Sequence, residues 1–214
     1  MVPHGAKRNI LTLAIIVGAI QGAWSPIEVR ASDDRLLRIE LVVFRGLGES
    51  QVDLVRREVD AIWAAHAVRV EWSRAEPTGC VRVVIDRPAS VLPAGREEQW
   101  SVASSRIVEG RVSPPIYVSL DAAERVVRAA SPPYSTPALA GIMVTRVLGR
   151  AMAHELAHVL LNTRAHAPHG LLRGRFTADD FVYPGREGFR LDDDQLVRAR
   201  QHELLVTSLH GDAR

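Results

Sequence analysis

The sequence has a single cysteine, Cys80, among its 214 residues. One cysteine excludes an intramolecular disulfide framework and any zinc site built from cysteine alone. Because Cys80 precedes an apolar run, we expect it to pack in the core rather than act as a reactive thiol. Lysine is nearly absent as well, with Lys7 the only one, and aromatic residues make up just 5% of the chain.

The chain also has no large excess of positive or negative charge. The chain has 27 basic and 25 acidic residues, and its formal net charge is +2. This balance carries no electrostatic signature of nucleic-acid binding, so we expect no nucleic-acid partner. Hydrophobic residues make up 47% and charged residues 24%, a composition typical of a globular protein.

The longest apolar run lies at the N-terminus. Lys7 and Arg8 precede an apolar stretch that begins at Ile10, which is the pattern of a secretory signal peptide. A membrane-spanning helix needs about 20 apolar residues, and residues 10–24 are fewer than that. We therefore interpret residues 1–31 as a signal peptide and residues 32–214 as one secreted or periplasmic domain. The alternative is an uncleaved membrane anchor through residues 10–24, the one case in which we expect membrane contact.

Hydrophobic periodicity predicts an α+β domain. Apolar and branched residues predict strands over residues 36–44, 68–72, 80–86, 100–108 and 115–120. Helical spacing predicts helices over residues 50–66, 121–130 and 192–205, the first with a capping pattern at Ser50 and Asp53. Residues 163–188 have the composition of a loop-rich segment.

A long helix is predicted between two clear boundary signals. Thr136 is a suitable N-cap and is followed by Pro137, while Asn162 accepts the left-handed conformation that ends helices. The segment between them is apolar on most sides, which indicates a helix that runs through the core. We expect Gly141 and Gly149 within it to mark close packing against the sheet.

This helix carries the motif His154-Glu155-Leu156-Ala157-His158. Two histidines four residues apart lie on the same helical face, so both imidazoles can reach one metal ion. Glu155 lies on the neighbouring part of the helix surface, where it can take a proton from a water molecule without being a metal ligand. Imidazole ligands suit Zn²⁺, whereas an ion that prefers oxygen, such as Ca²⁺, would not select this pair.

A catalytic zinc site needs a third protein ligand. His166 is the first candidate, because it follows a turn just long enough to reverse the chain after the helix. His169 is an alternative, and a carboxylate from a later segment would be another. The acidic candidates are Glu187, Asp179 and Asp180. We also expect Asp179, Asp180 and the acids at 192–194 to cap helices.

The motif, together with the segment that runs to Leu172, resembles the zincin metallopeptidases and in particular metzincin-like exported bacterial proteins. Metzincins continue the motif with a glycine and a third histidine, at positions that hold Leu161 and Arg164 here. The resemblance implies a zincin-like mixed sheet with a packing helix and a long active-site helix, followed by a small loop-rich and helical C-terminal subdomain. It also implies that Leu172 takes the place of a methionine beneath the metal.

The expected function is that of a zinc-dependent endopeptidase acting on a polypeptide substrate. His154, His158 and His166 would bind Zn²⁺, and Glu155 would act as general base. Tyr183 and His169 are candidates for the donor that stabilises the oxyanion. The alternative is a non-catalytic binding module of zincin fold that keeps zinc for stability, with His169 as a fourth ligand.

Overall fold

The computed structural model describes residues 35–73, 80–87, 101–130 and 136–199. The predicted signal peptide, the predicted loop over residues 88–99 and the end of the predicted C-terminal helix lie outside these residues. Within the described ranges, no helix combines the length and the apolar content that a membrane span requires.

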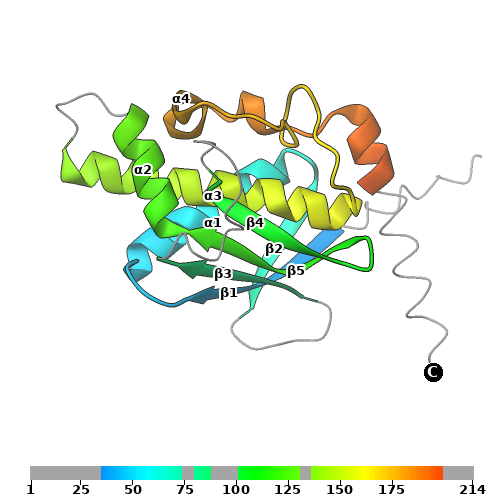
Figure 1. The fold of residues 1–214 in the computed structure, drawn as a ribbon, viewed down its shortest axis with the longest axis horizontal. Coiled ribbons are helices and arrows are strands. Elements are labelled where there is room, and N and C mark those ends of the chain that lie inside the picture. The colour runs from blue at the N-terminus through cyan, green and yellow to red at the C-terminus, as the bar shows by residue number, and fades with distance from the viewer. Residues whose placement is uncertain (1–34, 74–79, 88–100, 131–135, 200–214) are drawn as a thin grey trace, which may run out of the picture. The chain divides into compact units, whose positions relative to one another are not determined.

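A five-stranded mixed sheet forms the centre of the fold (Figure 1). Its strands are β1 (Arg35–Val43), β2 (Val68–Ser73), β3 (Val81–Asp86), β4 (Ala103–Val108) and β5 (Arg111–Ser119). They lie in the order β2-β1-β3-β5-β4, and only the β4–β5 pair is antiparallel. This confirms the predicted α+β class, but Cys80 is half-buried just before β3 instead of lying in the core.

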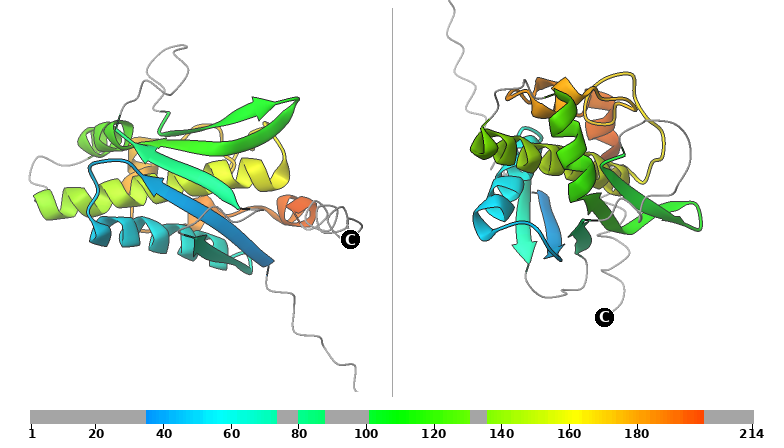
Figure 2. Two further views of the ribbon diagram at one scale, coloured as in Figure 1. Left: turned by 90° about the horizontal axis from the view of Figure 1, so that it is seen from below. Right: turned by 60° about the vertical axis from the view of Figure 1, so that its left-hand side comes forward.

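One face of the sheet is apolar because the strand residues alternate. Leu37 and Ile39 of β1 are buried, whereas Arg38 and Glu40 point to the other face and pair with charged residues of β2 and β3. The helices α1 (Glu49–Ala64) and α3 (Pro137–Leu161) pack along the apolar face and against each other (Figure 2). The core therefore lies between the sheet and these two helices.

Helix α1 begins slightly earlier than predicted. Its N-cap is Gly48, whose backbone N–H donates to Oε1 of Gln51 at 3.0 Å, so the expected capping role of Ser50 and Asp53 is wrong. The Gln51 side chain, reaching back to the N-cap residue, supplies the capping contact at this end of the helix. The buried stripe of α1 includes Val55, Val59, Ile62 and Trp63.

Helix α3 begins and ends where the sequence predicts. The Thr136 side chain accepts a hydrogen bond from the backbone N–H of Leu139, and Asn162 ends the helix in the left-handed region, at φ 43° and ψ 46°. Gly149 does mark a close approach, but to α1 and not to the sheet. A Cβ atom there would lie 2.7 Å from Cβ of Glu58 and 3.1 Å from the carbonyl oxygen of Val55. The expected packing against the sheet is therefore wrong.

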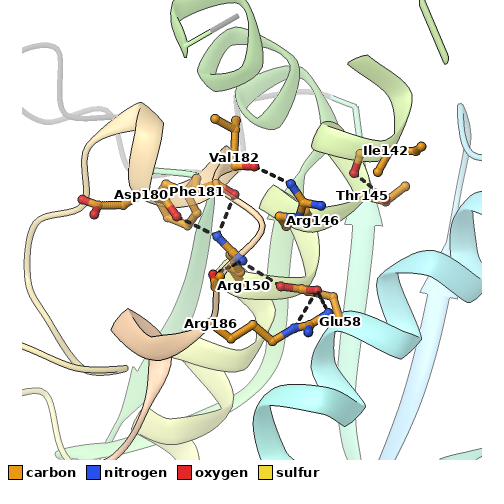
Figure 3. Close-up of polar contacts among 10 residues, drawn as sticks. Glu58, Ile142, Thr145, Arg146, Arg150, Asp180, Phe181, Val182 and Arg186 are labelled. Carbon is orange, nitrogen blue, oxygen red and sulfur yellow. Dashed lines mark hydrogen bonds and ion pairs between the residues drawn. The ribbon is translucent and has the colours of Figure 1, made fainter. Parts of the chain in front are cut away.

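The segment after α3 contains more helix than its composition predicts. After α2 (Leu120–Ala130) and α3 come the short helix α4 (Ala178–Val182) and the 3₁₀ helix η2 (Glu187–Phe189), and residues 193–199 are again helical. Asp192 and Asp180 accept helix-capping hydrogen bonds, as expected. This small C-terminal subdomain is held on α3 by Arg150, which lies between Glu58 and the carbonyl groups of α4 (Figure 3).

Candidate metal centre

Three histidines meet at the C-terminal half of α3. His154 and His158 come from the helix, one turn apart, and His166 comes from the loop that turns back after Asn162. One ring nitrogen of each lies within 4.8 Å of the others. The Nε2 atoms of His154 and His158 are 3.0 Å apart, and the ring of His166 stacks on that of His154.

The backbone fixes the protonation of both helical histidines. Nδ1 of His154 lies 2.6 Å from the carbonyl oxygen of Leu171, and Nδ1 of His158 lies 2.7 Å from that of Thr163. Because a carbonyl oxygen only accepts, each Nδ1 must carry the proton and donate it. In the neutral rings, both Nε2 atoms therefore present lone pairs toward the same point.

This arrangement fits a zinc ion. Burial, followed by the neighbouring His158, lowers the pKa of His154 to about 4, so its ring is neutral at physiological pH. Two lone pairs that face each other at 3.0 Å repel unless a cation lies between them. Tetrahedral zinc with Zn–N bonds of about 2.0–2.1 Å holds its nitrogen ligands about 3.3 Å apart, close to this separation.

The loop that carries His166 is held in place by its own backbone. The N–H of Ala167 donates to the carbonyl oxygen of Leu172 at 2.8 Å, which closes a turn through Gly170 at φ 77°. Gly174 then passes directly beside the imidazole. A Cβ atom at Gly174 would lie 3.0 Å from Cβ and 3.1 Å from Cγ of His166. The absence of a side chain at Gly174 therefore lets His166 approach the other two histidines.

Glu155 lies beside this cluster and is 8% exposed. Its Oε2 accepts a hydrogen bond from the hydroxyl of Ser105, in strand β4, at 2.7 Å. Burial raises the pKa of the Glu155 carboxyl, and the hydrogen bonds from Ser105 together with the charge of His166 oppose this rise. A carboxylate with a raised pKa is a better proton acceptor near neutral pH. Nothing in the sequence near Glu155 points to Ser105.

Aromatic rings pack behind the histidines. The ring of Phe176 meets that of His154 edge to face, with 5.9 Å between centroids, and stacks on Phe189 at 5.0 Å. Leu172 is buried in the same core, and Leu171 supplies the carbonyl group that orients His154. Phe176 lies in the loop before α4, 22 residues after His154, so no local spacing in the sequence indicates this contact.

The other predicted site residues lie outside the cluster. His169, Glu187 and Asp179 are exposed, and the three-histidine group includes none of them. The carboxylate of Asp180 accepts hydrogen bonds from the backbone N–H and the hydroxyl of Thr177, the N-cap of α4, and pairs with Arg173 at 2.7 Å. Tyr183 is 66% exposed at the end of α4, with its ring beside Gly185. The structure does not bring Tyr183 or His169 together with the cluster as a donor.

Comparison with solved structures shows the class of fold that this architecture represents. The chain is similar to the crystal structure of archaemetzincin from Methanopyrus kandleri, with a TM-score of 0.50 and 12% sequence identity. The match covers 82% of this chain and 99% of that one, so it spans the sheet and the helices described above. At this identity the likeness concerns the fold alone. The sequence matches no protein-family model, and no curated protein sequence matches it significantly.

Proposed function

We propose that this protein is a zinc-dependent endopeptidase, with His154, His158 and His166 as the zinc ligands and Glu155 as general base. The observation that carries the proposal is the pair of Nε2 lone pairs that face each other beside a third imidazole. A buried carboxylate adjoins them, and a metal centre used only for stability has no need of one. The resemblance to zincins and the archaemetzincin-like fold support the same class.

Zinc bound by these histidines would polarise the scissile carbonyl group and lower the pKa of a water molecule. Glu155 would take a proton from that water and then deliver it to the leaving amine. Its position one residue after His154 places the carboxylate beside the ligands without making it one. The raised pKa of Glu155 suits both steps, because the group must accept a proton and release it again.

Strand β4 is where an extended polypeptide would bind. It is the terminal strand in the order β2-β1-β3-β5-β4, so within the described part of the sheet one side of its backbone has no neighbouring strand. An exposed strand edge binds an extended peptide through main-chain hydrogen bonds. Ser105 of β4 contacts Glu155, so a peptide added to this edge would pass next to the proposed base.

The alternative, a zinc-stabilised binding module, is less well supported. It would need a fourth protein ligand to close the site, and His169 was the candidate. His169 is exposed and is not part of the histidine group. The open position that this leaves would be available to water and substrate.

The test combines zinc analysis with hydrolysis of an unfolded protein substrate. We expect one zinc per wild-type chain, cleavage of the substrate, and loss of cleavage on chelation. His166→Ala should lose zinc, and His169→Ala, three residues away, is the matched control that should retain it. A wild-type protein that holds zinc and cleaves none of a varied set of substrates would favour the binding module. Retention of zinc by His166→Ala would show that the third ligand is another residue.

Gly174→Ala is expected to weaken zinc binding about tenfold, because the new methyl group would press on His166 and tilt it away from the other ligands. Competition with a chelator of known affinity measures this change. Gly188→Ala is the control, since a Cβ atom there meets nothing within 4 Å. Equal zinc affinity in both variants would contradict the proposed steric role of Gly174.

Zinc affinity is expected to vary little between about pH 8 and pH 6.5 and to fall below that range. Burial is the main cause that lowers the pKa of His154, to about 4, and also that of His158 and His166. Each ring is therefore neutral more often than a free histidine at the same pH, and protons compete with zinc mainly below pH 6.5. Zinc titration at several pH values measures this. A steep loss of zinc affinity between pH 8 and pH 7 would contradict the expectation that the pKa values of these three histidines are lowered.

We also propose that the protein is exported, with residues 1–31 removed as a signal peptide. The basic residues followed by an apolar run support this proposal. Sequencing the N-terminus of the exported protein tests it, since an intact Met1 would favour the uncleaved anchor.

A further inference from the structure

We propose that Ser105 is a positioning residue for Glu155, an inference that rests on the proposed peptidase function. The Ser105 hydroxyl donates to Oε2 of Glu155 at 2.7 Å. The two residues are 50 positions apart, and their contact joins strand β4 to helix α3 directly at the histidine cluster. A hydrogen bond at this place restricts how the carboxylate can rotate, so it sets the direction in which the proposed base faces.

Strand β4 presents Ser105 toward the helix next to an irregularity in its pairing with β5. Ser104 pairs with Tyr117, but the next paired residue, Arg106, pairs with Ser113. Strand β4 thus advances by two residues while β5 advances by four, and Ser105 lies at this break in the ladder. The two extra residues therefore belong to β5. Because side chains alternate along a strand, Ser105 shares the face of Ala103, which packs against the core.

The chemistry of the partner distinguishes Glu155 from the other buried glutamates. Glu58 is held by Arg150 at 2.9 Å and by Arg186 at 2.6 Å, and Glu40 is held by Arg82 at 2.7 Å. Glu155 is as buried as these two, yet the side chain that binds it is a neutral hydroxyl. An arginine would orient a carboxylate and also neutralise it. A hydroxyl orients it and leaves its negative charge available to accept a proton.

The test uses Ser105→Ala and Ser105→Thr, with Ser113→Ala in the neighbouring strand β5 as the matched control. We expect Ser105→Ala to lower kcat about tenfold, with KM and zinc affinity changed less than about twofold. Ser105→Thr keeps the hydroxyl and should restore kcat, and Ser113→Ala should leave kcat unchanged. Unchanged kcat in Ser105→Ala would overturn the inference. So would loss of zinc from Ser105→Ala, or failure of Ser105→Thr to restore kcat.

A second readout needs neither zinc nor catalysis. In the metal-free protein, Ser105→Ala should lower the Tm by a few degrees, because it leaves a buried carboxylate without its donor. In a Glu155→Ala background the same change should leave the Tm nearly unaltered. Equal shifts in both backgrounds would show that Ser105 acts elsewhere and would overturn the inference. If the wild-type protein cleaves nothing, the proposed function fails, and this cycle alone decides whether Ser105 positions Glu155.

Discussion

Glu155→Gln is expected to lower the rate of peptide hydrolysis about a thousandfold and to leave zinc binding intact. Glutamine has nearly the same shape and can still accept the hydrogen bond from Ser105, but it cannot take a proton from water. The zinc ligands His154, His158 and His166 are unaltered in this variant. Steady-state cleavage of an unfolded substrate, measured together with zinc content, separates the loss of the base from the loss of the metal.

Glu187→Gln is the control for this variant. Glu187 is exposed and lies outside the histidine group, so the same chemical change there should affect neither rate nor zinc content. Near wild-type activity in Glu155→Gln would contradict the role of Glu155 as general base. Loss of zinc from Glu155→Gln would instead indicate that the carboxylate supports the metal site. Either result would require a different assignment of the groups around the cluster.

Arg150→Met is expected to destabilise the fold by about 3–5 kcal/mol, because it breaks a fully buried ion pair. Arg150 is 0% exposed and lies one helical turn before His154. Its guanidinium group binds Glu58 at 2.9 Å and the carbonyl oxygens of Asp180, Phe181 and Gly185 at 2.7, 3.2 and 2.6 Å (Figure 3). Methionine fills similar space and supplies none of these hydrogen bonds, so the polar groups around it would be left buried without a donor.

Urea unfolding of the metal-free protein measures this loss, so that zinc binding does not enter the comparison. Arg128→Met is the control, since Arg128 forms an exposed pair with Glu124 at 3.9 Å and should contribute less than about 1 kcal/mol. We also expect Arg150→Met to expose the α4 segment to proteolysis, because Arg146 would then be left to hold it through the carbonyl group of Val182. A loss below about 1 kcal/mol would mean that the aromatic packing of Phe176, Phe181 and Phe189 is sufficient to hold this subdomain.

The ends of the long helix and the spacing of its histidines can be predicted from neighbouring residues in the sequence. Thr136, Pro137 and Asn162 predict its two ends, because capping depends on the residues within one turn of each boundary. The four-residue spacing of His154 and His158 likewise follows from helix geometry alone. The turn after Asn162 limits how far the chain can travel, which is why His166 was the first candidate for the third histidine and lies in the cluster.

The short helices of the C-terminal subdomain, in contrast, cannot be predicted from neighbouring residues. Residues 163–188 have the composition of a loop, yet α4 forms within them and η2 begins there. Helix α4 has only five residues, and alone it would be too short to be stable in water. It is stabilised by Arg146 and Arg150 of α3, which donate to carbonyl groups of its last turn and of the following loop. These donors lie about 30 residues away in the chain, so no local pattern indicates them.

The sequence by itself determines the strands and the longer helices of this protein, the ends of the longest helix, and the spacing of two histidines and a glutamate on it. Each depends on residues within a few positions of one another, where backbone geometry is the same in any fold. Only the tertiary structure decides that Ser105 holds Glu155, that Glu58 pairs with Arg150 across 92 residues, and that Gly149 packs on α1. Those contacts depend on strand order, on where β4 lies beside α3, and on how closely two helices approach, and these properties arise only when the whole core packs.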